Sequence, residues 1–302
     1  MNAPSKVPAG VLAMVGETAR RQREAENRCL DLLAAEGFQQ VHLPVLEFAG
    51  DEPGSGYRFV DRAGHLIALR TDFTPLAARV LAPCLEPDAP PLHVCYAGEV
   101  IRPQPARLRR LPELYQLGFE SYGVRDGATR GLALTLELLR LTGVEPAACH
   151  LAVGVSGLAE KVLGRLCGAP PAEELVELLR VADVDALGDA LELSPGRRDA
   201  LAAAVLGEPA AGWAGRLGVA AEVGRVGPLL DAARGAGLDA SFELAPRLAG
   251  DYYRGVVFSL WGRHTRAVLA GGGEYVVTGV HGEVAAAGAC LALGIALEEA
   301  SC

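Results

Sequence analysis

The residues that decide the fold run from Tyr96 to Gly123 and read YAGEVIRPQPARLRRLPELYQLGFESYG. In the second half of this stretch, polar Gln116 and Glu120 alternate with apolar Leu117 and Phe119. Alternation with period two is typical of a β-strand, which presents the polar side chains on one face and the apolar ones on the other. The polar face is either the floor of a small-ligand pocket or an ordinary solvent-exposed face, and the pattern is compatible with both.

The first half of the same stretch concentrates positive charge in an acidic chain. Its arginines are Arg102, Arg107, Arg109 and Arg110, whereas the whole chain has 28 Lys and Arg against 37 Asp and Glu, a net charge of -9. A guanidinium group binds phosphate or carboxylate through two parallel hydrogen bonds, so the loop suits an anionic ligand. A solvated basic loop, or one that docks on an acidic partner surface, has the same composition.

Length and composition limit the class of protein. The chain has 302 residues, half of them hydrophobic, which suits about two domains or one domain with a large insertion and excludes a disordered protein. The acidic balance argues against nonspecific nucleic-acid binding, and the longest uncharged apolar run, Val284–Leu297, is too short to cross a membrane. The seven cysteines are scattered without zinc-ligand spacing, which predicts reduced thiols in a cytoplasmic protein without a metal site.

Hydrophobic periodicity outlines an α+β chain with an interruption. Helices are predicted over 17–35, which ends before Gly37, and over 129–142. Strands are predicted over 40–43, 66–69, 92–96, 116–120, 150–155, 240–245, 251–261, 265–270 and 275–278. Between these, a segment rich in Ala and Leu and broken by Gly and Pro is typical of short helices. We therefore expect a core formed by residues 1–156 and 238–302 and a helical insertion formed by residues 157–237.

The segment Leu69–Pro75, LRTDFTP, carries a second candidate for ligand binding. If it is extended, Asp72 and Thr74 share one face, where a carboxylate and a hydroxyl suit an ammonium group. The same residues also predict a helix start, with Thr74 as N-cap and Pro75 at the first helical position. The two interpretations are compatible with each other.

Two further segments lie near the end of the chain. In Asp251–Phe258, DYYRGVVF, the adjacent Tyr252 and Tyr253 of a strand should point to opposite faces, so that one of them reaches a pocket. In Gly271–Tyr275, GGGEY, three glycines allow a sharp turn or a close backbone approach to a ligand. No Lys-Ser or Lys-Thr follows them, so this is not a phosphate-binding P-loop.

Taken together and in order, these segments resemble the histidyl-tRNA synthetase family. The matching ranges are Gly37–Glu47 for motif 1, Tyr96–Gly123 for motif 2, Asp251–Phe258 and Gly272–Tyr275 for the two histidine motifs, and Leu293–Ala300 for motif 3. The resemblance implies a class II aminoacyl-tRNA synthetase-like catalytic-domain fold, in which an antiparallel sheet is flanked by helices. It places Arg102 at the position of the arginine that contacts ATP.

The departures from the family pattern concern its ATP chemistry. Glu299 stands where motif 3 has an arginine, Glu274 stands where the second histidine motif has one, and Leu248 stands where the catalytic arginine falls. Gln104 replaces a glutamate of motif 2, and the sequence stops after motif 3, so we expect no anticodon-binding domain. Aminoacylation of tRNA is therefore not expected, and we assign no catalytic residue.

The amino-acid pocket of the family is better preserved. The resemblance implies that Asp72 meets an α-ammonium group and that Glu120 and Tyr253 meet an imidazole. The full set of implied histidine-binding residues is Asp72, Thr74, Arg102, Gln116, Glu120, Tyr253 and Tyr275. A pocket retained without ATP chemistry is the profile of a sensor.

One synthetase-like family fits this profile, the regulatory subunits of short-form ATP phosphoribosyltransferases, whose Leu-Arg-x-Asp-x-Thr-Pro segment is matched here. This resemblance implies a chain without activity of its own or cofactor, which supports the first step of histidine biosynthesis together with a short catalytic subunit. It also implies histidine as the effector and a class II-type dimer within a hetero-oligomer. Two alternatives stay open: a synthetase paralogue that activates an amino acid for a non-tRNA acceptor, and a scaffold with a vestigial pocket.

Overall fold

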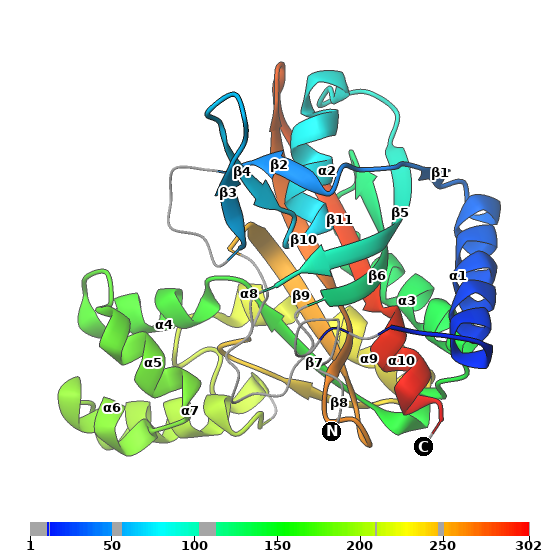
Figure 1. Cartoon of the computed structure of the whole chain (residues 1–302). Helices are drawn as coiled ribbons and strands as arrows, with labels where there is room; N and C mark the ends of the chain where they lie inside the picture. Colours follow the sequence, from blue (N-terminus) through cyan, green and yellow to red (C-terminus); the bar gives the residue numbers. More distant parts are fainter. Residues whose placement is uncertain are drawn as a thin grey trace, which may run out of the picture.

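The computed structural model describes residues 11, 13–49, 56–102, 113–208, 210–246 and 251–301 and is built around one large sheet (Figure 1). Its eight strands lie in the order β1-β5-β6-β11-β10-β9-β7-β8. In chain order they are β1 (Gln39–Gln40), β5 (Leu92–Ile101), β6 (Glu113–Tyr122), β7 (Cys149–Val155), β8 (Asp239–Phe242), β9 (Tyr253–Gly262), β10 (Val268–Gly279) and β11 (Gly282–Ala292). The six inner strands pair antiparallel, and the outermost pairs, β1 with β5 and β7 with β8, are parallel. The predicted α+β class with an antiparallel sheet is confirmed.

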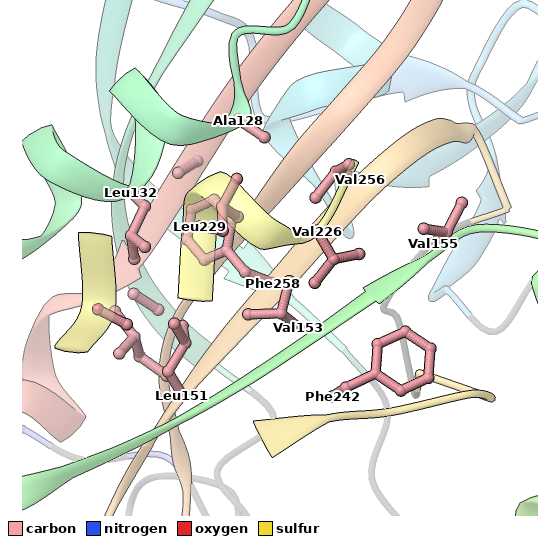
Figure 2. Packing of buried hydrophobic residues seen from close by; sticks show 14 of the residues in the cluster. Ala128, Leu132, Leu151, Val153, Val155, Val226, Leu229, Phe242, Val256 and Phe258 are labelled. Atoms are coloured by element: carbon pink, nitrogen blue, oxygen red, sulfur yellow. The ribbon is translucent and has the colours of Figure 1, made fainter. Parts of the chain in front are cut away.

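Helices cover this sheet and bury its apolar side chains. They include α1 (Glu17–Ala35), α3 (Ala128–Thr142), α9 (Gly227–Gly235) and α10 (Leu293–Glu299). Figure 2 shows Leu132 of α3 and Leu229 of α9 packed against Leu151 of β7 and Phe258 of β9. All four side chains are buried. Helix α1 matches the predicted 17–35, and Gly37 follows it with a φ of 87°.

Between β7 and β8 the chain is helical, as predicted. The elements are α4 (Leu158–Cys167), α5 (Glu173–Arg180), α6 (Val184–Ala190), α7 (Pro195–Val205), the 3-10 turn η4 (Ala210–Gly212), α8 (Ala220–Gly224) and α9. Pro195 stands at the first position of α7, where its missing N–H leaves no intrahelical bond unmade. Helices α8 and α9 contact β7, so the C-terminal part of the helical segment packs against the sheet. Its separation as an insertion over 157–237 stays a prediction.

A second, three-stranded sheet stands apart from the large one (Figure 1). It consists of β2 (Leu46–Phe48), β4 (Leu66–Leu69) and β3 (Arg58–Val60), with β4 in the middle. An ion pair between Glu47 of β2 and Arg79 of α2 (Phe73–Leu81) ties it to the body of the protein. The 3-10 turns η1 (Ala82–Cys84) and η3 (Pro146–Ala148) complete the described elements.

Several strands differ from their predicted limits, and two regions differ most. The strand expected over 40–43 is reduced to Gln39–Gln40. At Leu43 the side chain of Arg70 bridges the chain and β5 in place of direct backbone pairing, because Nη1 donates to Leu43 O at 2.7 Å and Nε to Glu99 O at 2.6 Å. The strands expected over 265–270 and 275–278 form one strand, β10, so the three glycines make no turn. A Cβ at Gly272 would collide with β11, which is why this position tolerates no side chain. None of the described helices is long and apolar enough to cross a membrane.

Candidate functional site

Glu120 lies at the centre of a buried polar cluster. It projects from β6 with no exposed surface, and three hydroxyl groups donate to its carboxylate. Thr74 Oγ1 and Tyr96 Oη lie 2.6 and 2.8 Å from Oε1, and Tyr275 Oη lies 2.8 Å from Oε2. Four separate elements, β6, α2, β5 and β10, therefore converge on one carboxyl group.

Burial sets the charge state of this carboxyl group. Desolvation raises the pKa of Glu120 to about 7, against the three hydroxyl donors that lower it, and the charge of Asp72 adds to the rise. Near neutral pH the group is therefore poised between its two protonation states. A cationic or hydrogen-bond-donating ligand beside it would favour the ionised form.

Asp72 is the second carboxylate of the site and also the N-cap of α2. Its side chain accepts a hydrogen bond from Thr74 N at 3.2 Å, so the prediction of Thr74 as N-cap was wrong by two residues. Thr74 lies inside the helix, where its hydroxyl is free to reach Glu120. Burial raises the pKa of Asp72, and Arg102, whose Nη2 lies 3.8 Å from Oδ2, opposes the rise.

The adjacent tyrosines point the same way, against the expectation from strand alternation. Their ring centroids are 4.4 Å apart, and Tyr252 Oη donates to Tyr253 Oη at 3.3 Å. The reason is that Tyr252 lies in the turn before β9, which begins at Tyr253, so the period of a strand does not apply. Tyr252 Oη also lies 3.3 Å from Asp72 Oδ2, which links the pair to the acidic cluster.

Gln116 lies on β6, as Glu120 does, and is buried with a side-chain hydrogen-bond acceptor that is not used. Its side chain is 4% exposed, and Oε1 makes no hydrogen bond with the part of the chain that the structure describes. Because both Gln116 and Glu120 are buried, the solvent-exposed alternative for this face of β6 was wrong. An unpaired buried acceptor costs free energy, so it is best satisfied by a donor on a ligand.

Tyr96 was missed by the sequence reasoning, and Tyr252 was named only as the alternative to Tyr253. A signal for Tyr96 existed in Gly118, the small residue between the two polar positions of β6. Tyr96 pairs with Gly118 in the sheet, and a Cβ at Gly118 would lie 2.6 Å from the tyrosine ring. The ring of Tyr96 therefore occupies the space that a side chain at position 118 would need.

The motif 3 position lies elsewhere and is occupied in another way. Glu299 is 3% exposed, and its carboxylate accepts hydrogen bonds from His264 N at 3.0 Å, Thr265 N at 2.8 Å and Thr265 Oγ1 at 2.7 Å. Burial raises its pKa, but these donors outweigh the burial, so the pKa lies below the ordinary value. Glu299 thus holds the turn between β9 and β10 in its ionised form. Gln104, Arg107, Arg109, Arg110 and Leu248 lie outside the described residues.

The structure thus brings the predicted residues together to different degrees. Glu120 accepts hydrogen bonds from Thr74 and Tyr275. Asp72 lies beside Arg102, and the hydroxyl group of Tyr252 links Asp72 to Tyr253. Gln116 shares the buried face of β6 without a hydrogen bond to the others. Among the described residues, no group of three or more His, Cys, Asp or Glu side chains is arranged to hold a metal ion.

Comparison with known proteins gives a consistent family. The family model described as histidyl-tRNA synthetase matches residues 10–297. The ATP phosphoribosyltransferase regulatory subunit of Moorella thermoacetica is 31% identical, with 91% of this chain and 76% of that protein covered. The protein of the same name from Azoarcus sp. is 33% identical, with 82% and 69% covered.

Solved structures share the fold. An ATP phosphoribosyltransferase regulatory subunit/histidyl-tRNA synthetase from Bacillus halodurans C superposes with a TM-score of 0.81 at 22% identity, covering 100% of this chain and 85% of that one. A chain of the ATP phosphoribosyl transferase (HisG:HisZ) complex from Thermotoga maritima superposes with a TM-score of 0.67 at 21% identity, covering 89% and 96%. The expected class II synthetase-like fold is thereby confirmed.

Proposed function

Because this chain belongs to the histidyl-tRNA synthetase family, and its relatives at 31–33% identity are regulatory subunits by name, we propose that it is the regulatory subunit of a short-form ATP phosphoribosyltransferase. In this role it binds the catalytic subunit and is required for its activity in the first step of histidine biosynthesis. It transmits feedback inhibition by histidine and catalyses neither aminoacylation nor phosphoribosyl transfer itself. The complex works in the cytoplasm, where thiols such as the exposed Cys84 stay reduced.

The observation that carries this proposal is the state of Glu299. The synthetase-like pattern has an arginine there for the phosphates of ATP, and here a buried carboxylate is engaged by the turn at His264 and Thr265. The negative charge of Glu299 repels a triphosphate. The hydrogen bonds from the turn residues hold the carboxylate in place, so it cannot rotate away from such a ligand. The amino-acid pocket, by contrast, keeps its polar groups.

The pocket suits histidine group by group. Asp72 would accept the α-ammonium, and Arg102, partly exposed beside it, would bind the carboxylate. Glu120 and Tyr253 would hold the imidazole, while Gln116 Oε1 has an acceptor to offer to a donor on the ligand. Thr74 and Tyr275 would act through Glu120, whose orientation they fix by hydrogen bonds.

Feedback inhibition would work by linkage. Histidine binds one arrangement of the complex more tightly than another and shifts the population towards it, and the catalytic subunit in turn changes the affinity for histidine by the same factor. Glu120 is suited to such a response, because a bound imidazole adds a hydrogen-bond donor to a carboxyl group whose pKa is about 7.

The small sheet supports the class II-type dimer that the resemblance implies. Two rows of side chains lie on one face of β2, β4 and β3, and both rows are apolar: Phe48, Ile67 and Phe59 in one, and Leu46, Leu69 and Tyr57 in the other. Phe48 is 74% exposed. The opposite face carries Glu47, whose ion pair with Arg79 turns it towards α2. The apolar face therefore points away from the body of the chain.

A second copy of the chain is the occupant that fits this apolar face. In a two-fold contact the same patch of both copies comes together, so a charge on it would be buried against apolar side chains, and these rows carry none. Four of the six side chains, exposed by 44 to 74%, offer roughly 450 Å² of apolar surface for each copy. Two copies would bury roughly 900 Å², near the roughly 1,000 Å² at which specific interfaces begin.

The proposed function is tested by isolating the protein natively from its source cell and assaying the eluate for transfer between ATP and phosphoribosyl pyrophosphate. We expect activity that histidine suppresses. The same assay with purified catalytic subunit, alone and with this chain added, measures the requirement for the regulatory subunit. An intact complex without transferase activity would contradict the proposal. Amino-acid-dependent exchange between ATP and pyrophosphate would then favour the paralogue that activates an amino acid.

A further inference from the structure

An ion pair between an exposed arginine and a buried glutamate joins the helical segment to the strand that carries Tyr275. Arg225 follows α8, and its Nη2 donates to Glu274 Oε2 at 2.6 Å and to Asp126 Oδ1 at 3.2 Å. The Glu274 side chain is 9% exposed, whereas that of Arg225 is 44% exposed. Neither residue belongs to the histidine pocket proposed above.

Glu274 lies directly before Tyr275 in β10 and faces an irregular stretch of β9. Gly273 pairs with Val257 and Tyr275 with Tyr253, so β9 has two extra residues here and forms a bulge. Glu274 Oε2 accepts a hydrogen bond from Val256 N of this bulge at 3.0 Å. The carboxylate therefore serves as the acceptor for one N–H group of the bulge.

The opposite strand leaves room for this carboxylate. Gly255 has a φ of +145°, and a Cβ at this position would collide with the Glu274 side chain. Beside it, Ser156, directly before the helical segment, donates from Oγ to Tyr253 O at 2.8 Å and from N to Gly255 O at 2.8 Å. The chain around the helical segment is thus attached at Ser156 and at Arg225, each time next to a tyrosine of the pocket.

From this geometry we propose that Arg225 is a positioning residue for the histidine pocket. The inference rests on the proposed function for the identity of the ligand. The ion pair of Arg225 holds the Glu274 carboxylate against the bulge of β9 and so fixes the part of β10 from which Tyr275 Oη reaches Glu120. The arrangement of α8 and α9 is thereby coupled to the affinity of the pocket. Because coupling is reciprocal, an effector in the pocket also stabilises the position of this helix pair.

The first test measures histidine binding by calorimetry on the full chain and on four variants. We expect Arg225→Ala and Glu274→Gln to bind histidine about five- to tenfold more weakly, the range usual for residues within one hydrogen-bond network. Arg225→Lys should recover part of the affinity, since it keeps the charge but has a shorter side chain without the planar guanidinium group. Arg234→Ala is the matched control, because Arg234 on α9 pairs with Asp231 of its own helix, and it should bind as the wild type does.

A structural control separates positioning from general destabilisation. Leu229→Ala loosens the buried face of α9 without touching Glu274. The two variants are compared at temperatures equally far below their melting temperatures. If Leu229→Ala then loses as much affinity for histidine as Arg225→Ala, the effect is merely structural and the proposal is wrong. Unchanged binding by Arg225→Ala would overturn it as well.

A second readout does not depend on histidine. The near-ultraviolet circular dichroism of the tyrosines should change in Arg225→Ala, and this change should vanish in a Tyr275→Phe background. If the wild type fails to bind histidine while this dependence on Tyr275 holds, the proposed effector is wrong and the positioning role stands. If the change persists in Tyr275→Phe, Arg225 does not act through Tyr275.

Discussion

Thr74 Oγ1 lies 2.6 Å from Glu120 Oε1, although 46 residues separate the two in the chain. The contact exists because Asp72 begins α2 and leaves Thr74 inside the helix, where its hydroxyl turns towards β6. The residue that caps the helix and the residue that supports the buried carboxylate are therefore different members of one short segment. A ligand between Asp72 and Glu120 would touch both ends of this arrangement.

Changing Glu120 tests the pocket. Glu120→Ala should raise the histidine concentration needed for half-inhibition of the transferase by at least about tenfold, since a hydrogen bond between the bound imidazole and the ionised carboxylate contributes roughly 1.5–3 kcal/mol. Assembly with the catalytic subunit should be unchanged, and gel filtration of the mixture checks it. Glu283→Ala, at an exposed position on β11, is the matched control. An unchanged inhibition curve in Glu120→Ala would rule out the assignment of the pocket.

The raised pKa of Glu120 predicts a pH dependence of stability. Below pH 4.5 the group is protonated in both folded and unfolded chains, and between 4.5 and about 7 it ionises only in the unfolded one. The free energy of unfolding should therefore fall by up to about 3 kcal/mol as pH rises through this window. Urea titrations at several pH values measure it, and Glu120→Gln should remove this part of the slope. An equal slope in the two proteins would contradict the buried neutral carboxyl group.

The apolar face of the small sheet is tested by mass. Wild type should sediment as a dimer at micromolar concentration, and Phe48→Asp should sediment as a monomer, because the dimer would bury a charge against the apolar face of the other copy. Val280→Asp is the control, since Val280 is 71% exposed and lies in the turn between β10 and β11. A monomeric wild type would refute the dimer. If Phe48→Asp lost the catalytic subunit instead, the face would belong to that partner.

Glu299→Arg tests the loss of ATP chemistry. The arginine would leave the N–H groups of His264 and Thr265 without an acceptor, so we expect thermal or urea unfolding to show a loss of about 1–3 kcal/mol in stability. Glu299→Gln should lose less, because its amide oxygen still accepts. Charging of tRNA should be undetectable in both variants. Measurable aminoacylation by Glu299→Arg would show that one residue, rather than the whole site, suppresses synthetase activity.

The local sequence pattern predicted helices and strands well where neighbouring residues alone determine the element. The helix over 17–35 follows from its periodicity and Gly37, and the strand of Gln116 and Glu120 follows from alternation. The prediction failed where a distant group intervened. Arg70 bridges Leu43 and β5 where the strand was expected to continue, and the turn before β9 placed Tyr252 beside Tyr253. Neither event has a signature within the local sequence.

By itself, the sequence determined which residue types stand at each position of the synthetase-like motifs, and therefore the fold family and the replacement of arginine by Glu299. Periodicity, capping and glycine positions act over a few residues, so they can be read along the chain. Only the tertiary structure decided that the carboxylate of Glu120 is buried under three hydroxyl groups, one of them from Tyr275, 155 residues away. It also decided that Glu299 holds a turn and that Arg225 reaches Glu274. These contacts depend on hydrogen-bond geometry to a fraction of an ångström, which arises when separate elements pack against one sheet.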